Sequence, residues 1–181
     1  SADLSAIVSD RHLQRLRDLV AEAEAAGARV MRLQETHHPA LRKFPPTAIL
    51  SPDPGLRVMR EEIFGPVLPV LGYASPEEAL AFVAERDRPL ALYVFAEDPA
   101  DRAPWLAGSL SGGMAVNETI LQVAVDTLPF GGVGASGIGA YHGDAGFESF
   151  SHMKPVLTQP RWNGTSVVEP PFGAWKRRLA R

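Results

Sequence analysis

Short apolar runs that alternate with helical patterns are the feature of this sequence that most constrains its fold. Apolar runs of strand length occupy residues 67–71, 90–95 and 114–116. A helix start lies in each interval between them, because Ser75 and Asp98 can each cap a helix and each is followed directly by proline. Strands and helices in this order usually form a parallel sheet covered by the helices. We therefore predict a layered α/β fold with a parallel sheet.

The segments on either side extend this pattern. Residues 10–26 carry apolar side chains at helical spacing, with Ser9 or Asp10 as the cap and Gly27 as the end of the helix. Residues 160–181 are expected to be a solvated tail that becomes basic toward its end. The other expected elements are strands over residues 29–33, 47–50 and 154–158 and a helix over residues 144–152.

The composition excludes several classes of protein. The chain has 181 residues and a formal net charge of −3, which argues against a general nucleic-acid binder. No apolar run approaches the roughly 20 residues of a membrane span, and the first residues lack the pattern of a signal peptide. The chain contains no cysteine, which excludes a disulfide, a zinc–thiolate site and a cysteine nucleophile within these residues. We expect a cytoplasmic protein.

A glycine-rich motif at residues 132–137 matches the dinucleotide-binding pattern G-x-G-x-x-G letter for letter. That pattern binds a dinucleotide where a strand precedes it, a helix begins within it and an acidic residue follows about 20 residues later. Residues 128–130 make a poor strand, and Gly139 and Gly143 prevent a clean helix start. We therefore interpret the motif as a tight loop in which backbone segments approach closely.

Two other kinds of site lack their required spacing. Ser136 lacks the second glycine of the hydrolase motif G-x-S-x-G. The histidines show no metal-ligand spacing, and the adjacent His37 and His38 have side chains that diverge. Glu148 and His152 lie four residues apart on an expected helix, and we interpret them as a surface or interface pair. We predict no metal site.

Two more specific segments carry a resemblance to a known family. The first is residues 61–67, EEIFGPV, and the second is residues 117–119, NET, followed by residues 128–137, LPFGGVGASG. In this order and spacing they resemble the aldehyde dehydrogenase superfamily, and residues 141–143, YHG, extend the match. They are most similar to the branch that holds the coniferyl-aldehyde, class 3 and fatty-aldehyde dehydrogenases. The resemblance runs from the first helix to Val156.

The resemblance implies an enzyme that oxidises an aldehyde to a carboxylic acid with NAD or NADP. In that family a thiolate attacks the aldehyde, hydride passes to nicotinamide, and water hydrolyses the thioester. By the same resemblance, Glu62 accepts hydrogen bonds from the nicotinamide ribose hydroxyls, which suits a carboxylate, and Phe64 gives the nicotinamide an apolar face. Glu61 is expected to be structural. The residues expected to support the substrate pocket are Asn117, Phe130, Tyr141 and His142.

The family's catalytic cysteine, general-base glutamate and complete nucleotide-binding domain lie upstream of the matched region. A serine would not replace the cysteine, because a neutral hydroxyl is a poorer nucleophile. We therefore expect residues 1–152 to be the C-terminal portion of the catalytic domain, residues 153–159 an oligomerisation strand of a homodimer and residues 160–181 a tail. The full-length enzyme would oxidise coniferyl aldehyde or another aromatic or long-chain aldehyde, and the isolated chain is expected to be inactive. The alternative is a natural, non-catalytic dimerisation or binding module.

Overall fold

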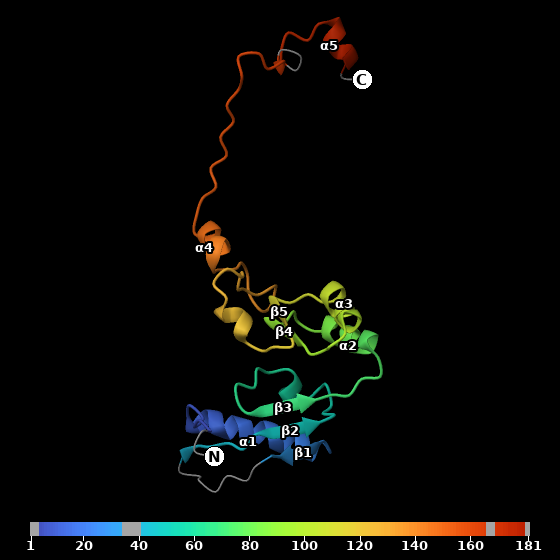
Figure 1. The fold of residues 1–181 in the computed structure, drawn as a ribbon, viewed down its shortest axis with the longest axis vertical. Helices are drawn as coiled ribbons and strands as arrows, with labels where there is room; N and C mark the ends of the chain where they lie inside the picture. Colours follow the sequence, from blue (N-terminus) through green and yellow to red (C-terminus); the bar gives the residue numbers. More distant parts are fainter. Residues whose placement is uncertain (1–3, 34–40, 166–168, 180–181) are drawn as a thin grey trace. The chain divides into compact units, whose positions relative to one another are not determined.

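The computed structural model describes residues 4–33, 41–165 and 169–179 (Figure 1). The chain divides into two compact units, Ser1–Phe82 and Val83–Arg181. This division falls inside the segment 1–152 that the sequence predicts to be one portion of a catalytic domain, and the boundaries of that segment stay a prediction. The predicted diverging pair His37 and His38 lies outside the described residues.

Helix α1, Asp10–Ala25, supplies much of the core of the first unit. The Ser9 hydroxyl caps it by accepting a hydrogen bond from the His12 amide at 3.2 Å. Gly27, just beyond its end, has a φ of +86°, a conformation that glycine adopts without steric cost. The predicted helix and both of its ends are therefore confirmed. Its buried side chains are Leu13, Leu16, Leu19, Val20 and Ala23.

Three strands form the sheet of the first unit, β1 (Arg29–Arg32), β2 (Thr47–Leu50) and β3 (Val67–Val70). They lie in the order β1-β2-β3, with β1 antiparallel and β3 parallel to the central strand. The short helix η2 (Arg57–Met59) joins the second and third strands, and α1 contacts both η2 and β1. One buried cluster unites these elements, and it consists of Ile7, Leu13, Leu16, Val20, Ala23, Phe44, Ile49, Val58 and Val67.

Helix α2, Pro76–Ala84, leads into the second unit, where strands β4 (Ala91–Val94) and β5 (Gly113–Val116) pair in parallel. Helix α3, Pro99–Gly108, connects the two strands, and the Asp98 carboxylate caps it by accepting a hydrogen bond from the Ala100 amide at 2.8 Å. This strand–helix–strand unit has the predicted order.

Parallel pairing is confirmed for β2 with β3 and for β4 with β5, and the α/β class is confirmed with it. The strands expected in one parallel sheet, at residues 67–71, 90–95 and 114–116, lie in two sheets, because β3 pairs with β2 whereas β4 pairs with β5. The other departure is the pairing of β1 with β2, which is antiparallel. Arg32 lies opposite Thr47, so the chain re-enters the sheet at the end where it left. A parallel return must instead carry the chain back along the whole strand, as α3 does between β4 and β5.

The last third of the chain departs most from the sequence prediction. The short helix η3 (Leu121–Ala124) follows β5, and helix α4 covers Gly143–Ser149, ending before His152. Among the described residues, 154–158 pair with no strand. Because the expected strand joins two copies, its partner would lie in another chain, and it stays a prediction. The tail contains a helix that was not predicted, α5, Ala174–Leu179.

Candidate functional site

The segment that enters β3 displays two of the predicted site residues. Glu62 and Phe64 are exposed, Phe64 at 74%, whereas Ile63 between them packs against the buried cluster of the first unit. Phe64 has a φ of +51°, a left-handed conformation that is costly for a residue with a bulky side chain. The surroundings must therefore hold this backbone in place.

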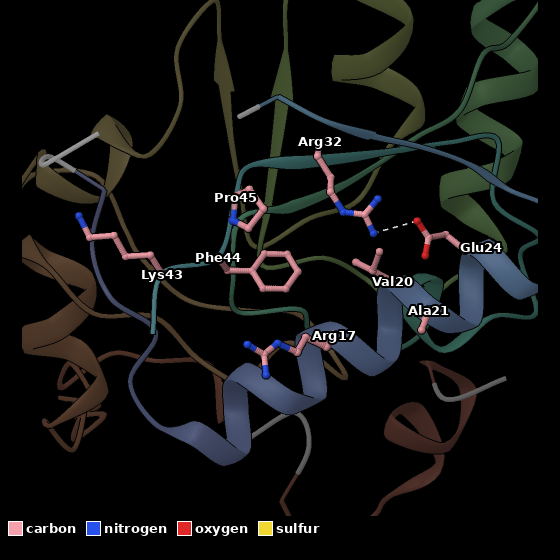
Figure 2. A pocket seen from close by; sticks show the side chains of 8 residues that line it. All are labelled: Arg17, Val20, Ala21, Glu24, Arg32, Lys43, Phe44 and Pro45. Carbon is pink, nitrogen blue, oxygen red and sulfur yellow. Dashed lines mark hydrogen bonds and ion pairs between the residues drawn. The ribbon is translucent and has the colours of Figure 1, made fainter. Parts of the chain in front are cut away.

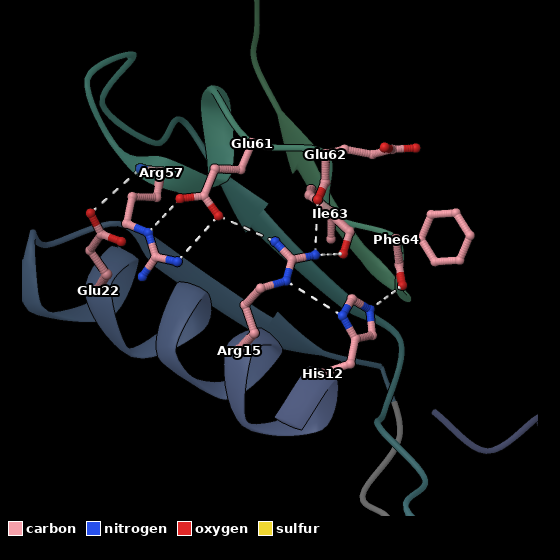
Figure 3. Close-up of polar contacts among 8 residues, drawn as sticks. All are labelled: His12, Arg15, Glu22, Arg57, Glu61, Glu62, Ile63 and Phe64. Atoms are coloured by element: carbon pink, nitrogen blue, oxygen red, sulfur yellow. Dashed lines mark hydrogen bonds and ion pairs between the residues drawn. The ribbon is translucent and has the colours of Figure 1, made fainter. Parts of the chain in front are cut away.

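Helix α1 holds the segment through three consecutive carbonyl groups, as Figure 3 shows. One guanidinium nitrogen of Arg15 donates hydrogen bonds to the carbonyl oxygens of Glu62 and Ile63, at 2.9 and 2.5 Å. The Nε2 atom of His12 lies 2.7 Å from the carbonyl oxygen of Phe64. The side chains of Glu62 and Phe64 extend away from Arg15 (Figure 3). The segment is thus held by its backbone while these two side chains are presented to the surroundings.

Glu61 belongs to the same polar network. Its carboxylate accepts a hydrogen bond from Nε of Arg57 at 2.7 Å and from Arg15 at 3.3 Å. The hydrogen bond and positive charge of Arg57 lower the pKa of the Glu61 carboxyl, and Glu61 in turn raises the pKa of Arg57. These contacts agree with the interpretation of Glu61 as a structural residue.

Two recesses border α1. The first has a volume of about 600 Å³ and includes the two residues that hold the segment at 62–64; its lining consists of Arg11, His12, Gln14, Arg15 and Asp18. The second has a volume of about 290 Å³ and is shown in Figure 2; its lining consists of Arg17, Val20, Ala21, Glu24, Arg32, Lys43, Phe44 and Pro45. In the second recess Arg32 is paired with Glu24 at 2.8 Å. None of the predicted site residues lines it.

Asn117 lies directly after β5 and ties it to the end of β4. Its side-chain Oδ1 accepts a hydrogen bond from the Ala96 amide at 2.8 Å, and its Nδ2 donates to the Ala96 carbonyl at 3.0 Å. Its φ is +56°, which asparagine tolerates better than most residues. Asn117 therefore fixes the carboxyl ends of two parallel strands, the edge beyond which open α/β sheets bind ligands.

The other three predicted pocket residues come together in the second unit. Phe130 and Tyr141 form an antiparallel bridge, and their rings meet edge-to-face with centroids 5.5 Å apart. The His142 ring stacks on Phe130 at 6.0 Å and meets Tyr141 edge-to-face at 4.5 Å. The Nδ1 atom of His142 is buried and has no hydrogen-bond partner within the described part of the chain. The cluster thus combines aromatic faces with one unsatisfied polar atom.

The glycine-rich motif at residues 132–137 forms a closed loop. The Ser136 hydroxyl accepts a hydrogen bond from the Val133 amide at 2.9 Å and lies 3.2 Å from the Val133 carbonyl oxygen. A Cβ atom on Gly132 would overlap the Ser136 backbone, and no helix begins within the motif. The interpretation as a tight loop is confirmed, and Ser136 serves to close it.

Glu62 and Phe64 lie in the first unit, and the four predicted pocket residues lie in the second. The sequence analysis assigned no role to His12 and Arg15, which lie in the helix that it predicted over residues 10–26. Their partners are backbone carbonyls between 47 and 52 residues further along the chain. A carbonyl group is present at every residue, so the sequence carries no signal for these contacts.

The family assignment comes from the comparison with known sequences. The profile described as "Aldehyde dehydrogenase family" matches residues 1–156. This chain belongs to the aldehyde dehydrogenase family. The resemblance carried by residues 61–67 and by the segment that begins at Asn117 is therefore confirmed.

Individual aldehyde dehydrogenases match nearly the whole chain. The chain is 44% identical to a probable coniferyl aldehyde dehydrogenase of Caulobacter vibrioides, over 97% of this chain and 38% of that protein. It is 42% identical to the dimeric NADP-preferring aldehyde dehydrogenase of Rattus norvegicus, over 90% of this chain and 35% of that protein. The structure of Staphylococcus aureus AldH in a substrate-bound state matches with a TM-score of 0.78 and 37% identity, over 97% of this chain and 38% of that one. This aldehyde dehydrogenase chain thus spans little more than a third of the length of these relatives.

The part of this aldehyde dehydrogenase chain that the structure describes contains no group of three or more histidine or acidic side chains placed to hold a metal ion. None of its described helices is long and apolar enough to cross a membrane. The candidate site residues are the exposed pair Glu62 and Phe64 in the first unit, and Asn117 with the aromatic cluster of Phe130, Tyr141 and His142 in the second.

Proposed function

We propose that this chain is the C-terminal part of an NAD(P)-dependent aldehyde dehydrogenase that oxidises an aldehyde to the carboxylic acid. The observation that carries the proposal is the presentation of Glu62 and Phe64 on an anchored segment of the first unit. Ile63 packs against the buried cluster, whereas its neighbours Glu62 and Phe64 are exposed, Phe64 at 74%. An exposed aromatic ring held on a constrained backbone suits a binding role.

The chemistry of the two side chains fits the nicotinamide end of NAD or NADP. The Glu62 carboxylate has two acceptor oxygens, which can take hydrogen bonds from both hydroxyls of a ribose. The Phe64 ring offers an apolar face beside it, and the fixed backbone sets the spacing between the two. When bound, the cofactor would supply the acceptor for the hydride that leaves the substrate. The contribution of this chain is to bind and orient it.

The second unit would contribute to the substrate side. Phe130, Tyr141 and His142 form a cluster of aromatic faces with the buried Nδ1 atom of His142 among them. Aromatic faces suit a planar aromatic aldehyde or an apolar chain, and an unsatisfied ring nitrogen can orient a polar group. This composition favours coniferyl aldehyde or another aromatic or long-chain aldehyde, in line with the name of the Caulobacter vibrioides relative.

The nucleophile must come from outside these 181 residues, because the chain has no cysteine. The isolated chain should therefore bind and position groups but not oxidise aldehydes. The absence of cysteine also favours the alternative, a natural non-catalytic dimerisation or binding module, because such a module needs no nucleophile. What the gene encodes before Ser1 distinguishes the two. We further propose that residues 153–159 join two copies into a homodimer and that the protein is cytoplasmic.

The test begins with the coding region upstream of Ser1. If it encodes a cysteine nucleophile and a nucleotide-binding domain, the full-length protein is produced and assayed for reduction of NAD⁺ and NADP⁺ with coniferyl aldehyde and long-chain aldehydes. Glu62→Gln and Phe64→Ala should each raise the KM for NAD(P)⁺ roughly tenfold, the effect of losing one hydrogen bond to a charged group or one apolar contact face. Glu85→Gln, a substitution at an exposed glutamate of the second unit, is the matched control.

Three results would contradict the proposal. The first is a stop codon directly before Ser1, which would favour the non-catalytic module. The second is a full-length protein with no aldehyde-dependent reduction of either nucleotide. The third is an isolated chain that reduces NAD(P)⁺ with aldehyde, because it would place the nucleophile inside a chain that lacks cysteine.

A further inference from the structure

We propose that His12 and Arg15 are positioning residues that set the orientation of Glu62 and Phe64 toward the cofactor. The inference rests on the proposed function, because it concerns the cofactor that Glu62 and Phe64 would bind. It adds two residues to which the sequence assigns no role. Both lie on α1, one turn apart, and both contact the segment through its backbone.

Arg15 uses its planar guanidinium as a fork. One terminal nitrogen donates to the carbonyl oxygens of Glu62 and Ile63, and the other donates to the Glu61 carboxylate at 3.3 Å. The Arg15 side chain is 27% exposed, and its contact with the Ile63 carbonyl is partly buried. Lysine has only a single ammonium group on a flexible stem and cannot hold three acceptors in this arrangement. The fork therefore fixes the peptide planes on both sides of Ile63.

The hydrogen-bond partners of His12 define its tautomer. The Phe64 carbonyl oxygen can only accept, so the Nε2 atom of His12 carries the hydrogen. The Nε–H group of Arg15 points at Nδ1 of His12 at 3.4 Å and can only donate, so Nδ1 is the accepting nitrogen. The His12 ring thus links Arg15 to Phe64, and the two side chains form one connected pair.

The pair of His12 and Arg15 restrains the backbone of residues 62–64, which would otherwise adopt a less strained conformation. Phe64 has a φ of +51°, which an unrestrained phenylalanine rarely adopts. The hydrogen bond from His12 and the two from Arg15 hold the three carbonyl groups toward α1 (Figure 3). The Glu62 side chain extends away from Arg15, and the Phe64 ring lies edge-to-face with the His12 ring, with centroids 6.2 Å apart. If these bonds are lost, Glu62 and Phe64 remain in the sequence but lose their fixed orientation. The predicted defect is therefore in cofactor binding.

The experiment uses the full-length enzyme of the proposed function, in which KM and kcat are measured for NAD(P)⁺ and for an aldehyde. His12→Ala and Arg15→Ala should each raise the KM for NAD(P)⁺ by about fivefold or more, with the KM for aldehyde unchanged. His12→Gln should recover most of the loss, because a glutamine amide can donate from a similar distance. Arg15→Lys should not recover it. Arg17→Ala, on the same helix but outside the contacts with residues 62–64, is the matched control.

A double-mutant cycle separates positioning from general stabilisation. If Arg15 acts through Glu62, Arg15→Ala should raise the cofactor KM much less in a Glu62→Gln background than in the wild type. An equal effect in both backgrounds would overturn the proposal, as would a cofactor KM that stays unchanged or that rises equally in Arg17→Ala. If Arg15→Ala does not fold, the His12→Ala and His12→Gln pair decides the question. An inactive wild type would instead refute the proposed function, and the positioning role with it.

Discussion

Leu16 of α1 packs directly against Gly65, 49 positions further along the chain, and leaves no room for a side chain there. A Cβ atom at position 65 would lie 2.6 Å from Cδ1 and 2.8 Å from Cδ2 of Leu16. Leu16 is fully buried, so it cannot swing away without opening the core. The glycine that follows Phe64 is thus required by packing, and it brings the segment at 61–66 close enough to α1 for the polar contacts to form.

Gly65→Ala should therefore destabilise the first unit. The added methyl group must displace Leu16 or the segment itself, at a cost of about 1–3 kcal/mol. The measurement is the free energy of unfolding in urea. Gly72→Ala is the matched control, since a Cβ there would meet no atom within 4 Å. Equal stability of the two variants would contradict the packing argument.

Glu61 should give the protein a defined dependence of stability on pH. Arg57 lowers the pKa of Glu61 in the folded state below its ordinary value of 4.5. A carboxyl with a lowered folded pKa contributes stability that is fully present above its unfolded pKa and is lost as the pH falls through its folded pKa. Glu61→Gln should therefore be less stable than the wild type at neutral pH, and the difference should shrink below pH 4.5.

The check is the urea midpoint of both proteins over a series of pH values. Glu62→Gln is the control for this measurement, because the contacts with Arg15 and Arg57 involve the Glu61 carboxylate and not that of Glu62. If the difference in urea midpoint between Glu61→Gln and the wild type stayed constant at acidic pH, the pH dependence would not come from the Glu61 carboxyl.

Asn117 should stabilise the second unit through both its side chain and its backbone conformation. Asn117→Gly removes the two hydrogen bonds to Ala96 but adopts the φ of +56° without strain. It should lower the free energy of unfolding by about 1–2 kcal/mol. Asn117→Ala removes the same bonds and adds backbone strain, so it should cost about 1 kcal/mol more. The measurement is the midpoint of thermal unfolding. The order of the two variants is decisive, because an alanine variant as stable as the glycine variant would exclude the backbone contribution.

Gly132 should tolerate no side chain. Its Cβ would overlap the backbone of Ser136 and Gly137, which cannot move as a flexible side chain can. Gly132→Ala should therefore disrupt the closed loop and lower the thermal midpoint, whereas Gly113→Ala, with no atom within 4 Å of the added Cβ, should have a smaller effect. Hydrogen exchange at the Val133 amide would report opening of the loop. Unchanged protection of that amide would count against the close backbone approach.

Much of the local structure could be predicted from the sequence. The apolar spacing along α1, the Ser9 cap and Gly27 place that helix correctly at both ends. The strands and the helix between β4 and β5 follow from the alternation of apolar runs and caps. These features succeed because each depends on interactions between residues close together in the chain.

The sequence predictions fail where the local structure depends on contacts with residues far along the chain. The antiparallel pairing of β1 with β2 depends on where the chain re-enters the sheet, which hydrophobic periodicity does not encode. Residues 90–95 form a continuous apolar run, which is typical of a buried strand. Only Val94 among them is buried, since a sheet of two strands leaves much of its surface uncovered. Helix α4 ends before His152, so the spacing between Glu148 and His152 does not place them on one helix.

The sequence by itself determined the family and the residue types that the site offers. The run EEIFGPV at residues 61–67 supplies a carboxylate and an aromatic ring at fixed spacing. The chemistry of a side chain follows directly from the identity of its residue. Only the tertiary structure decided that Glu62 and Phe64 are exposed while Ile63 packs against the core, and that His12 and Arg15 hold this segment. The physical reason is that these contacts join side chains to backbone carbonyls far along the chain, and the packing of Gly65 and Ile63 against the core brings the two within hydrogen-bond distance.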